Sequence, residues 1–535
     1  MEGDRKPHIR GLFFRDIPHV VLIRLDWKSF LGKEGLASLL LVLGLAYFFS
    51  AKGLVEISDT DYSLRTAKAL LEEGTFLIDP PDPAFAASSQ KVVDGKIYSK
   101  YGVGLVLVLL PLVLLAKAFA ILPGLQEAHV TGFLVSFYNI PFALGALYFL
   151  HRICLQLGSS KRSATIVVLA MGAGTFFWKY TVTDYSEVTQ LFFLLGTIFY
   201  LFRSREGDFV KGSAFFSALI LMKLVNVLLW GPLAVYVAIR HGAGKSGIRK
   251  MAAFASVVFI TGLLLLLYNH LRFGSPFSTG YESGAPMFTM ENFRRDFVAF
   301  FISPQRGLFV FNPIVLAALP FWPAFLKQHK AEGFCLVLIV ALWFVLMASW
   351  VSYQGGWAWG NRLLVFTIPL LLVPLAFTRF REYWHAALFC GLFLISVYIQ
   401  MIAVFQHTHE YFVILRDMGE DSEVSGYIGA MPSQLVGNAV LAHQKLAGIS
   451  GEYSYAAFIG KHLPESLSSK GISTKEYDSY QGFHAWPFHL ATFLGQPILR
   501  WLLAGFLPCL VIILYQMFKL SWPTSNSLGG QLLVD

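Results

Sequence analysis

Apolar runs of nearly bilayer length recur along this chain from Leu36 to the C-terminal region, and short polar or charged segments separate them. A helix that crosses the hydrocarbon core of a membrane needs about 17–25 predominantly apolar residues. The composition agrees, because 56% of the 535 residues are hydrophobic and only 14% are charged, against about 25% charged in soluble domains. The sequence therefore predicts an all-α polytopic membrane protein and excludes a soluble globular domain.

The net charge of +9 would suggest a nucleic-acid partner in a soluble protein. Here the lysines and arginines lie in short loops between the apolar runs, which is the pattern that orients helices in a membrane. We therefore expect the lipid bilayer, and no nucleic acid, as a partner. The four cysteines are widely spaced and indicate neither a disulfide framework nor a cysteine-based metal site.

The basic residues also predict how the chain is threaded. Seven lysines and arginines lie in the first 35 residues, which places the N-terminus in the cytoplasm. We count about twelve transmembrane helices and expect the protein in the cytoplasmic (inner) membrane. The predicted parts are a cytoplasmic segment 1–35, a transmembrane domain 36–405 with external loops 54–102 and 272–305, an external region 406–494, and a final transmembrane helix with a cytoplasmic tail over 495–535.

For two segments, the number of apolar runs differs from the number of membrane crossings that the basic loops require. The basic loop after residue 151 requires an odd number of crossings between 103 and 151, so 103–122 either crosses the membrane or lies along its surface. Residues 213–239 must cross twice, which predicts short or broken helices near Lys223 and Pro232. Such breaks are tolerated at membrane depth only where they line a protein cavity.

The stretch from Ser58 to Gly74 follows the first apolar run and has an amphipathic pattern, from which we expect a juxtamembrane helix in the first external loop. Its start carries Asp59 and Asp61. Ser58 and Asp61 fit a capping box, so the pair has a purely structural interpretation. One capping residue is enough for one helix, however. A further carboxylate at the membrane surface is energetically costly, so its presence suggests a functional role.

A second acidic cluster, Asp184 and Glu187, lies between two predicted spans on the same external side. Two carboxylates that converge on one face could act in general-base catalysis or bind a metal ion. We therefore take Asp59, Asp61 and Asp184 as candidate catalytic residues. This hypothesis requires Asp59 and Asp184 to face one positively charged pocket on the outer side.

Basic residues gather at the external ends of the predicted spans. Taken alone, each has a structural interpretation, as a long side chain that extends its charge to the membrane interface. Together they suggest a phosphate or pyrophosphate site, because arginine binds phosphate oxygens in pairs and lysine adds a point charge. The candidate substrate-binding cations are Lys96, Lys100, Arg272, Arg306 and Arg362.

Trp357 and Trp359 lie in a glycine-rich stretch. Tryptophan is common at membrane interfaces, which gives these two a structural interpretation. The alternative is a stacking wall for a sugar or an isoprenoid chain. The segment His407-Thr408-His409-Glu410 has metal-ligand side chains, but it is too short and isolated to be a strong metal signal.

These motifs resemble the GT-C class of membrane glycosyltransferases, especially the polyprenyl-phosphate-dependent protein O-mannosyltransferases and the lipid A aminoarabinose transferase. In that class the first external loop carries an Asp-Glu-x-x-Tyr-like motif, a surface helix and a glycine. Counted back from Gly74, Asp59 falls at the catalytic aspartate, while Thr60 replaces the usual glutamate and the tyrosine comes one residue early at Tyr62. The resemblance leaves open whether Asp59 or Asp61 is the base.

The resemblance is closest over about residues 36–205 and implies a GT-C-like fold. Such an enzyme moves a sugar from a polyprenyl-phosphate carrier to an acceptor hydroxyl on a glycan, lipid or protein at the external (periplasmic) face, with inversion. Asp59 would be the general base, and Lys100 matches the lysine that contacts the carrier phosphate. Asp184 matches a later external aspartate of the class, and Glu187 beside it is expected to contact substrate.

Three alternatives stay open. A divalent metal ion could bridge Asp59, Asp61 and Asp184, because members of the class differ in their use of metals. A transporter or lipid flippase would also have about twelve spans, but it would carry ionisable residues near mid-span, where Lys223 is the main example here. A lipid-linked-glycan ligase or polymerase would depend on external arginine and histidine rather than on an aspartate after the first span.

Overall fold

The computed structural model of the protein describes residues 35–79, 90–281, 287–353, 355–378, 383–417, 433–446, 483–494 and 496–521. The predicted cytoplasmic segment 1–35 lies almost entirely outside these residues, as do much of the predicted external region 406–494 and the tail after residue 521. The division of the chain into these parts therefore stays a prediction.

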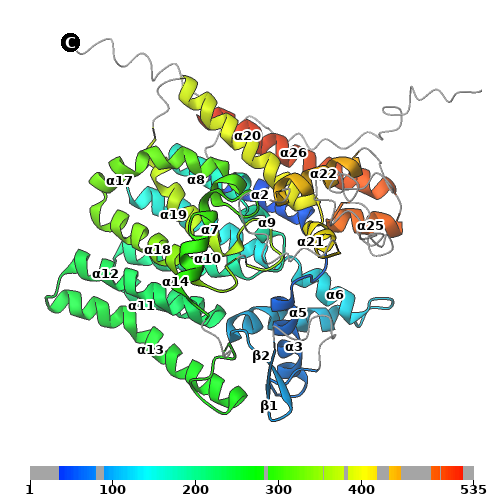
Figure 1. Ribbon diagram of the computed structural model, residues 1–535, viewed down its shortest axis with the longest axis horizontal. Coiled ribbons are helices and arrows are strands. Elements are labelled where there is room, and N and C mark those ends of the chain that lie inside the picture. Colours follow the sequence, from blue (N-terminus) through cyan, green and yellow to red (C-terminus); the bar gives the residue numbers. More distant parts are fainter. Residues whose placement is uncertain are drawn as a thin grey trace, which may run out of the picture.

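The described chain is mostly helical, and its helices pack into one bundle (Figure 1). The N-terminal half contains α2 (Leu36–Ser50), α3 (Ser58–Glu72), α5 (Val103–Phe119), α6 (Glu127–Val135), α7 (Asn139–Gln156), α8 (Lys161–Gly174), α9 (Phe177–Thr181), α10 (Glu187–Arg203), α11 (Asp208–Met222), the 3₁₀ helix η1 (Leu224–Leu229), α12 (Trp230–His241) and α13 (Lys245–Phe273).

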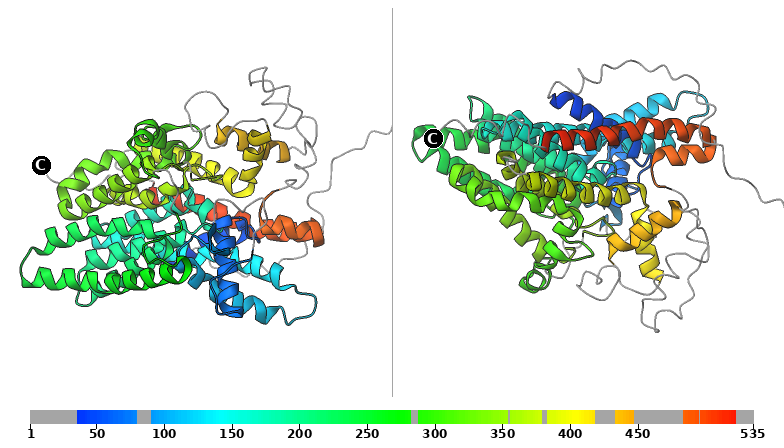
Figure 2. Two further views of the ribbon diagram at one scale, coloured as in Figure 1. Left: turned by 60° about the horizontal axis from the view of Figure 1, so that its bottom comes forward. Right: turned by 90° about the horizontal axis from the view of Figure 1, so that it is seen from above.

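The C-terminal half combines long helices with short and broken ones. These are α14 (Met290–Asp296), α15 (Ala299–Ile302), α16 (Leu308–Phe311), η2 (Pro313–Phe321), α17 (Trp322–Gln328), α18 (Lys330–Ser349), η3 (Arg362–Phe366), α19 (Thr367–Leu372), η4 (Val373–Phe377), α20 (Tyr383–Phe405), α21 (Thr408–Asp417), α22 (Gln434–Leu446), α25 (Trp486–Leu494) and α26 (Gln496–Ser521). The last of these, red in Figure 2, packs against α2, α8 and α20.

Six helical stretches of the described chain are long and apolar enough to cross a membrane: Glu127–Gln156, Leu224–His241, Lys245–Phe273, Lys330–Ser349, Tyr383–Phe405 and Ala504–Ser521. Shorter apolar helices cover Leu36–Ser50, Val103–Phe119 and Arg362–Phe377. The chain is therefore a helical membrane protein, as predicted. The count of about twelve spans stays a prediction, as does the crossing of the membrane by residues 103–122.

The predicted helix break near Lys223 is confirmed. α11 ends at Met222, and after Lys223 the chain continues as the 3₁₀ helix η1 before α12 begins at Trp230. The break projects Lys223 into a site built from several helices, which is described below.

A short β-hairpin departs from the all-α expectation. Strands β1 (Gln90–Val93) and β2 (Lys96–Ser99) pair antiparallel, with Val93 opposite Lys96. Asp94 and Gly95 form the turn with φ of 50° and 75°, because a two-residue hairpin loop that follows the strand twist needs positive φ at both positions. The hairpin lies beside α3 at one end of the molecule (Figure 1).

Helix α3 is held by its apolar face. Leu64 and Ala67 are buried in a separate hydrophobic cluster with Leu105 and Leu109 of α5 and with Met222. Burial of this face fixes the rotation of α3 about its axis, since residues three and four apart share one side of a helix. The first turn of α3, with its acidic residues, is thereby directed toward the end of α11.

Two glycines allow α5 to begin against the last turn of α11. A Cβ atom at Gly102 would lie 2.4 Å from the carbonyl oxygen of Leu221, and one at Gly104 would lie 2.6 Å from the carbonyl carbon of the same residue. No side chain fits at these distances, because the obstructing atoms are backbone. The glycines therefore place Tyr101, which precedes them, next to Lys223, which follows α11.

Candidate active site

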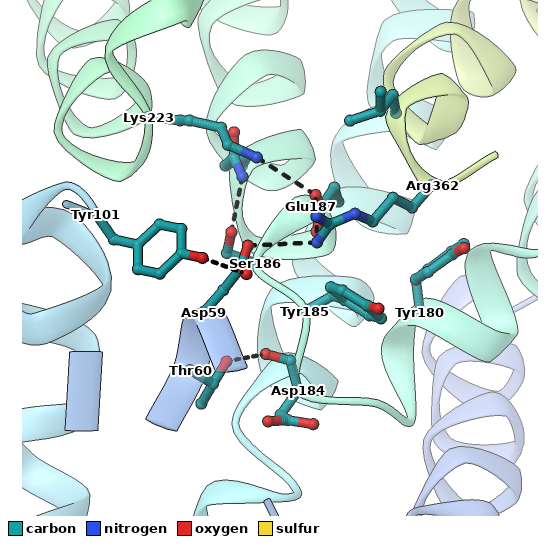
Figure 3. A network of polar contacts seen from close by, with 12 residues as sticks. Asp59, Thr60, Tyr101, Tyr180, Asp184, Tyr185, Ser186, Glu187, Lys223 and Arg362 are labelled. Carbon is teal, nitrogen blue, oxygen red and sulfur yellow. Dashed lines mark hydrogen bonds and ion pairs between the residues drawn. The ribbon is translucent and has the colours of Figure 1, made fainter. Parts of the chain in front are cut away.

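Asp59 is the centre of a buried polar cluster (Figure 3). It lies in the first turn of α3, and its side chain is 15% exposed. The Tyr101 hydroxyl donates to Asp59 Oδ1 at 2.7 Å, and Arg362 Nη1 donates to Asp59 Oδ2 at 3.3 Å. Both carboxylate oxygens are thus held by residues distant in the sequence.

Glu187 supplies a second carboxylate to the same cluster. Arg362 Nη1 and Lys223 Nζ each lie 3.6 Å from Glu187 Oε1. Glu187 lies in the first turn of α10, where the helix dipole favours negative charge, and its side chain is only 2% exposed. The Arg362 guanidinium also lies over the Tyr185 ring, 4.4 Å from its centroid.

Lys100 adds a third cation. Its ammonium lies 5.0 Å from the centroid of the Tyr281 ring and 5.7 Å from that of Tyr101. Burial lowers the pKa of Lys100, and the negative charge of Asp59 opposes that shift. Among the residues just described, two carboxylates therefore face three cations, and the excess positive charge suits an anionic ligand such as a phosphate.

The cluster keeps Asp59 ionised. Burial by itself would raise the pKa of this carboxyl, but Arg362, Lys223 and the hydrogen bond from Tyr101 lower it below its ordinary value of 3.8. Asp59 is thus a carboxylate at neutral pH, which is the form that can accept a proton.

Arg362 reaches the cluster from the C-terminal half because its loop folds tightly. Asn361 caps η3 by accepting a hydrogen bond from the Leu363 amide at 3.1 Å and donates to the Tyr353 carbonyl at 2.8 Å. Gly355 has a φ of 75°, and a Cβ atom there would lie 2.9 Å from Arg362 Cγ. Glycine at 355 therefore permits both the turn and the close approach.

Asp61, the alternative base, does not face the cluster. Its Oδ2 pairs with Arg65 Nε at 2.8 Å one turn along α3, and the two side chains are 39% and 35% exposed. Asp59 and Asp61 project in different directions because residues two apart on a helix do not share a face. The structure thus favours Asp59 over Asp61.

The prediction that Asp184 shares a pocket with Asp59 is wrong. Its carboxylate accepts hydrogen bonds from the backbone amides of Glu56 at 3.3 Å and Ile57 at 3.1 Å, and it points away from Asp59 (Figure 3). Its carbonyl accepts from the Thr60 hydroxyl. Asp184 therefore holds the start of α3, and the hypothesis in the form that required Asp59 and Asp184 to face one pocket is overturned. The second carboxylate beside Asp59 is Glu187, since Arg362 pairs with both. A metal ion bridging Asp59, Asp61 and Asp184 is not supported.

Asp184 is buried, and hydrogen bonds hold the turn around it, which agrees with a positioning role. Burial and the neighbouring charge of Glu56 raise the pKa of Asp184 to about 8, and the amide donors oppose that shift. Asn139 of α7 holds the turn from the other side, because its Nδ2 donates to the carbonyls of Thr183 at 2.8 Å and Tyr185 at 2.6 Å.

Arg272 is a structural residue rather than a phosphate ligand. Its Nη1 donates to the carbonyls of Ser99 at 2.6 Å and Tyr101 at 3.2 Å, and its Nη2 donates to Asn269 Oδ1 at 3.1 Å. The guanidinium also lies over the Tyr268 ring. Arg272 therefore fixes the segment that carries Lys100 and Tyr101, and it acts on the cluster only through that segment.

Four other predicted residues lie outside the Asp59 cluster. Arg306 is buried and donates to the Gly356 carbonyl at 2.8 Å. Trp357 is half-buried, whereas Trp359 is fully buried and packs edge-on against Phe311, so Trp359 cannot form an accessible stacking wall. Lys96 is exposed beside the hairpin turn.

Sequence reasoning missed several residues of the cluster. The sequence predicts a helix break and a mid-span charge at Lys223 but no contact with Glu187, and it assigns no role to Tyr101, to Tyr185 or to Asn139, which holds the neighbouring turn. The helix break at Lys223 was the one available signal, since broken helices line cavities. The contacts of the tyrosines and of Asn139 depend on the packing of distant helices, which no local pattern shows.

A second polar cluster lies beside the first. One ligand atom each of Glu56, His407 and His409 lies within 4.8 Å of the other two, a spacing that could hold a metal ion. Burial lowers the pKa of His409 and lowers that of His484 to about 3. These histidines are therefore neutral at physiological pH.

No family model matches this chain, and no curated protein matches it in sequence. Among solved structures it is similar to ArnT from Cupriavidus metallidurans bound to undecaprenyl phosphate, with 13% identity, a TM-score of 0.45, and coverage of 93% of this chain and 76% of ArnT. It is also similar to the oligosaccharyltransferase AglB from Archaeoglobus fulgidus in complex with an inhibitory peptide and a dolichol-phosphate, with 11% identity and a TM-score of 0.40.

The match to AglB covers 82% of this chain and 57% of AglB, so this chain spans less than two thirds of that protein. ArnT is the lipid A aminoarabinose transferase, and both proteins are GT-C glycosyltransferases. These solved structures thus belong to the class that the sequence motifs resemble. With TM-scores below 0.5 the likeness is distant, and the function proposed next depends on the residues of this chain.

Proposed function

We propose that this chain is a membrane glycosyltransferase that moves a sugar from a polyprenyl-phosphate carrier to an acceptor hydroxyl on the external side of the cytoplasmic membrane, with inversion. The observation that carries the proposal is the buried Asp59 carboxylate, which is held ionised beside Arg362, Lys223 and Lys100. A base and a phosphate site are thereby combined in one cluster of a membrane protein. The lipid carrier and the external side come from the sequence resemblance and the predicted topology.

Asp59 has the capacity to act as the general base. An ionised carboxylate has about four acceptor positions, and Tyr101 and Arg362 occupy two of them. An acceptor hydroxyl can therefore donate to Asp59. As its oxygen bonds to the anomeric carbon, the proton passes to Asp59, the bond from that carbon to the phosphate oxygen breaks, and the electron pair leaves with the phosphate. Such proton transfer typically contributes about 10²–10⁴-fold to the rate.

The three cations would stabilise the leaving phosphate. Charge grows on the phosphate as the glycosidic bond breaks, and fixed cations placed where charge develops lower the barrier. Glu187 pairs with both Arg362 and Lys223 and keeps their side chains in the cluster. In this proposal Lys100 and Arg362 contact the phosphate directly, and Glu187 positions its partners.

The ion pair of Lys223 also bears on the transporter alternative. That alternative drew its support from Lys223 as an ionisable residue near the middle of a predicted span. The 3.6 Å pair between Lys223 and Glu187 joins this residue to the Asp59 cluster, which supports a role in the same site rather than in a separate transport path.

A transfer assay with matched variants tests the proposal. The full chain would be reconstituted in liposomes with a panel of polyprenyl-phosphate sugars labelled in the sugar, and transfer to membrane acceptors or to water would be measured. We expect Asp59→Asn to lower the rate by at least about 10²-fold, while Asp61→Asn, which removes a more exposed acid two residues away, retains it within a few-fold. Equal rates for Asp59→Asn and the unaltered protein, at equal amounts of monodisperse protein, would remove the mechanism.

A further inference from the structure

The second cluster joins two segments that are far apart in the sequence. Glu56 lies two residues before α3, while His407 and His409 lie where α20 gives way to α21. Glu56 Oε1 and His407 Nε2 are 3.5 Å apart. Tyr185 lines the pocket beside these residues and also lies under Arg362, so the second cluster adjoins the proposed active site but is built from other side chains.

The spacing of the three residues suits a metal ion. Two imidazoles and one carboxylate are a common donor set for Zn²⁺, whose bonds of about 2.0–2.2 Å place neighbouring ligand atoms about 3.3–3.5 Å apart. The Glu56 to His407 distance already has this value, and all three ligand atoms lie within 4.8 Å of one another.

Neighbouring groups orient these ligands. His409 Nε2 lies 3.0 Å from the Trp357 carbonyl oxygen, which can only accept, so this nitrogen carries the hydrogen and Nδ1 is the one that can bind a metal. His484 Nε2 forms a short hydrogen bond with Glu56 Oε1. Such second partners are a regular feature of metal sites, because they fix the tautomer and the direction of each ligand.

The space at the cluster suits a single small ligand. Glu56, His407, His409 and His484 line a pocket with room for about one water-sized particle, about 10 Å³. A sugar or a phosphate ester is therefore too large, whereas one ion, or one ion in place of a water molecule, fits.

Two lysines oppose a bound cation. Lys179 lines the same pocket, and Lys52 Nζ donates to the carbonyls of Val404 at 2.5 Å and His484 at 2.6 Å. Their charge weakens the attraction for a metal but leaves the three ligand atoms in place. The direct bonds to the metal must therefore supply the affinity, which favours a transition metal over Mg²⁺ or Ca²⁺, since imidazole suits the former.

We propose that Glu56, His407 and His409 bind one divalent transition-metal ion of the Zn²⁺ class, with His484 orienting Glu56. The ion would tie the chain after α20 to the residue three positions before Asp59. Its role would thus be structural, and the site stands whether or not the proposed transferase activity is correct.

Metal analysis of the purified full chain tests this inference. After incubation with ZnCl₂ and removal of the excess, we expect about one equivalent of Zn²⁺ per chain by elemental mass spectrometry. Glu56→Gln keeps the shape of the side chain but removes its charge, and it should weaken Zn²⁺ binding by at least about tenfold. His443→Gln is the matched control, because His443 is an exposed histidine on α22, and it should keep the full equivalent.

Thermal unfolding of the same samples provides a second measurement that does not depend on a variant folding perfectly. A chelator should lower the Tm of the unaltered protein, added Zn²⁺ should restore it, and Glu56→Gln should respond to neither. Zn²⁺ bound equally by Glu56→Gln and the unaltered protein, or no Zn²⁺ bound and no change of Tm on chelation, would overturn the assignment.

Discussion

At the scale of single residues, Arg362 connects the two carboxylates of the candidate active site. Its Nη1 lies 3.3 Å from Asp59 Oδ2 and 3.6 Å from Glu187 Oε1. A buried carboxylate without a partner would take up a proton, because burial disfavours its charged form. The state of Asp59 therefore depends on whether this guanidinium is present.

The pH dependence of sugar transfer tests whether Arg362 keeps Asp59 ionised. Because the pKa of Asp59 is lowered, the base is ionised at every pH above that lowered pKa, and its activity is lost only as the pH falls through it. Arg362→Gln removes the first of the lowering causes, so burial then raises the pKa and the acidic limb of kcat/KM should move to higher pH. Arg306→Gln is the control, since its guanidinium is bonded to the Gly356 carbonyl, and it should leave the limb in place.

An acidic limb at the same pH in Arg362→Gln and in the unaltered protein would contradict this account of Asp59. A lower rate alone would not support it, because Arg362 is also proposed to contact the phosphate. The position of the limb is the informative quantity.

Residue types alone identify several members of the Asp59 cluster but give Asp184 the wrong role. Asp59, Glu187, Lys100 and Arg362 could be selected because buried acids and interfacial cations are unusual in membrane proteins and suggest function. Asp184 was assigned to the wrong role, because its chemistry alone does not tell that it faces the Glu56 and Ile57 amides rather than Asp59.

At the scale of helices, the contact between α5 and α11 brings the parts of the cluster together. Gly102 and Gly104 abut the backbone of Leu221 and Met222. This approach places Lys100 and Tyr101, just before α5, beside Lys223, just after α11.

Substitution of one glycine tests this contact. Gly104→Ala would place a Cβ atom 2.6 Å from the Met222 nitrogen, so the two helices must separate, and overpacking of this kind typically costs about 1–3 kcal/mol. We expect a lower Tm and weaker use of the donor. Gly262→Ala in α13 is the control, because nothing lies within 4 Å of its Cβ position and alanine favours a helix. Equal Tm values for the two variants would show that the contact is not tight.

Helix positions were more predictable than helix contacts. The predicted break near Lys223 is present, because helix-breaking composition is a local property of the sequence. The sequence does not predict the hairpin of Gln90–Val93 and Lys96–Ser99, because each strand has four residues. Such short strands show too little alternation of apolar and polar residues to be recognised. The glycine contact between α5 and α11 was likewise invisible, because it joins residues more than a hundred positions apart.

At the scale of the whole molecule, the chain passes through the bundle several times to assemble one cluster. Asp59 comes from the loop after the first apolar helix, Glu187 and Lys223 come from the middle of the chain, and Arg362 comes from its C-terminal half. Arg362 pairs with both Asp59 and Glu187, and Lys223 pairs with Glu187, so residues distant in the sequence meet in one cluster (Figure 3). The central claim is that this convergence forms the binding site for the phosphate of a lipid carrier.

A structure of the protein in lipid nanodiscs with bound polyprenyl phosphate tests that claim most directly. The account predicts the phosphate within hydrogen-bonding distance of Lys100 and Arg362, with Asp59 beside it and the polyprenyl chain leading into the membrane. A phosphate bound elsewhere on the protein, with no contact to Lys100, Lys223 or Arg362, would contradict it.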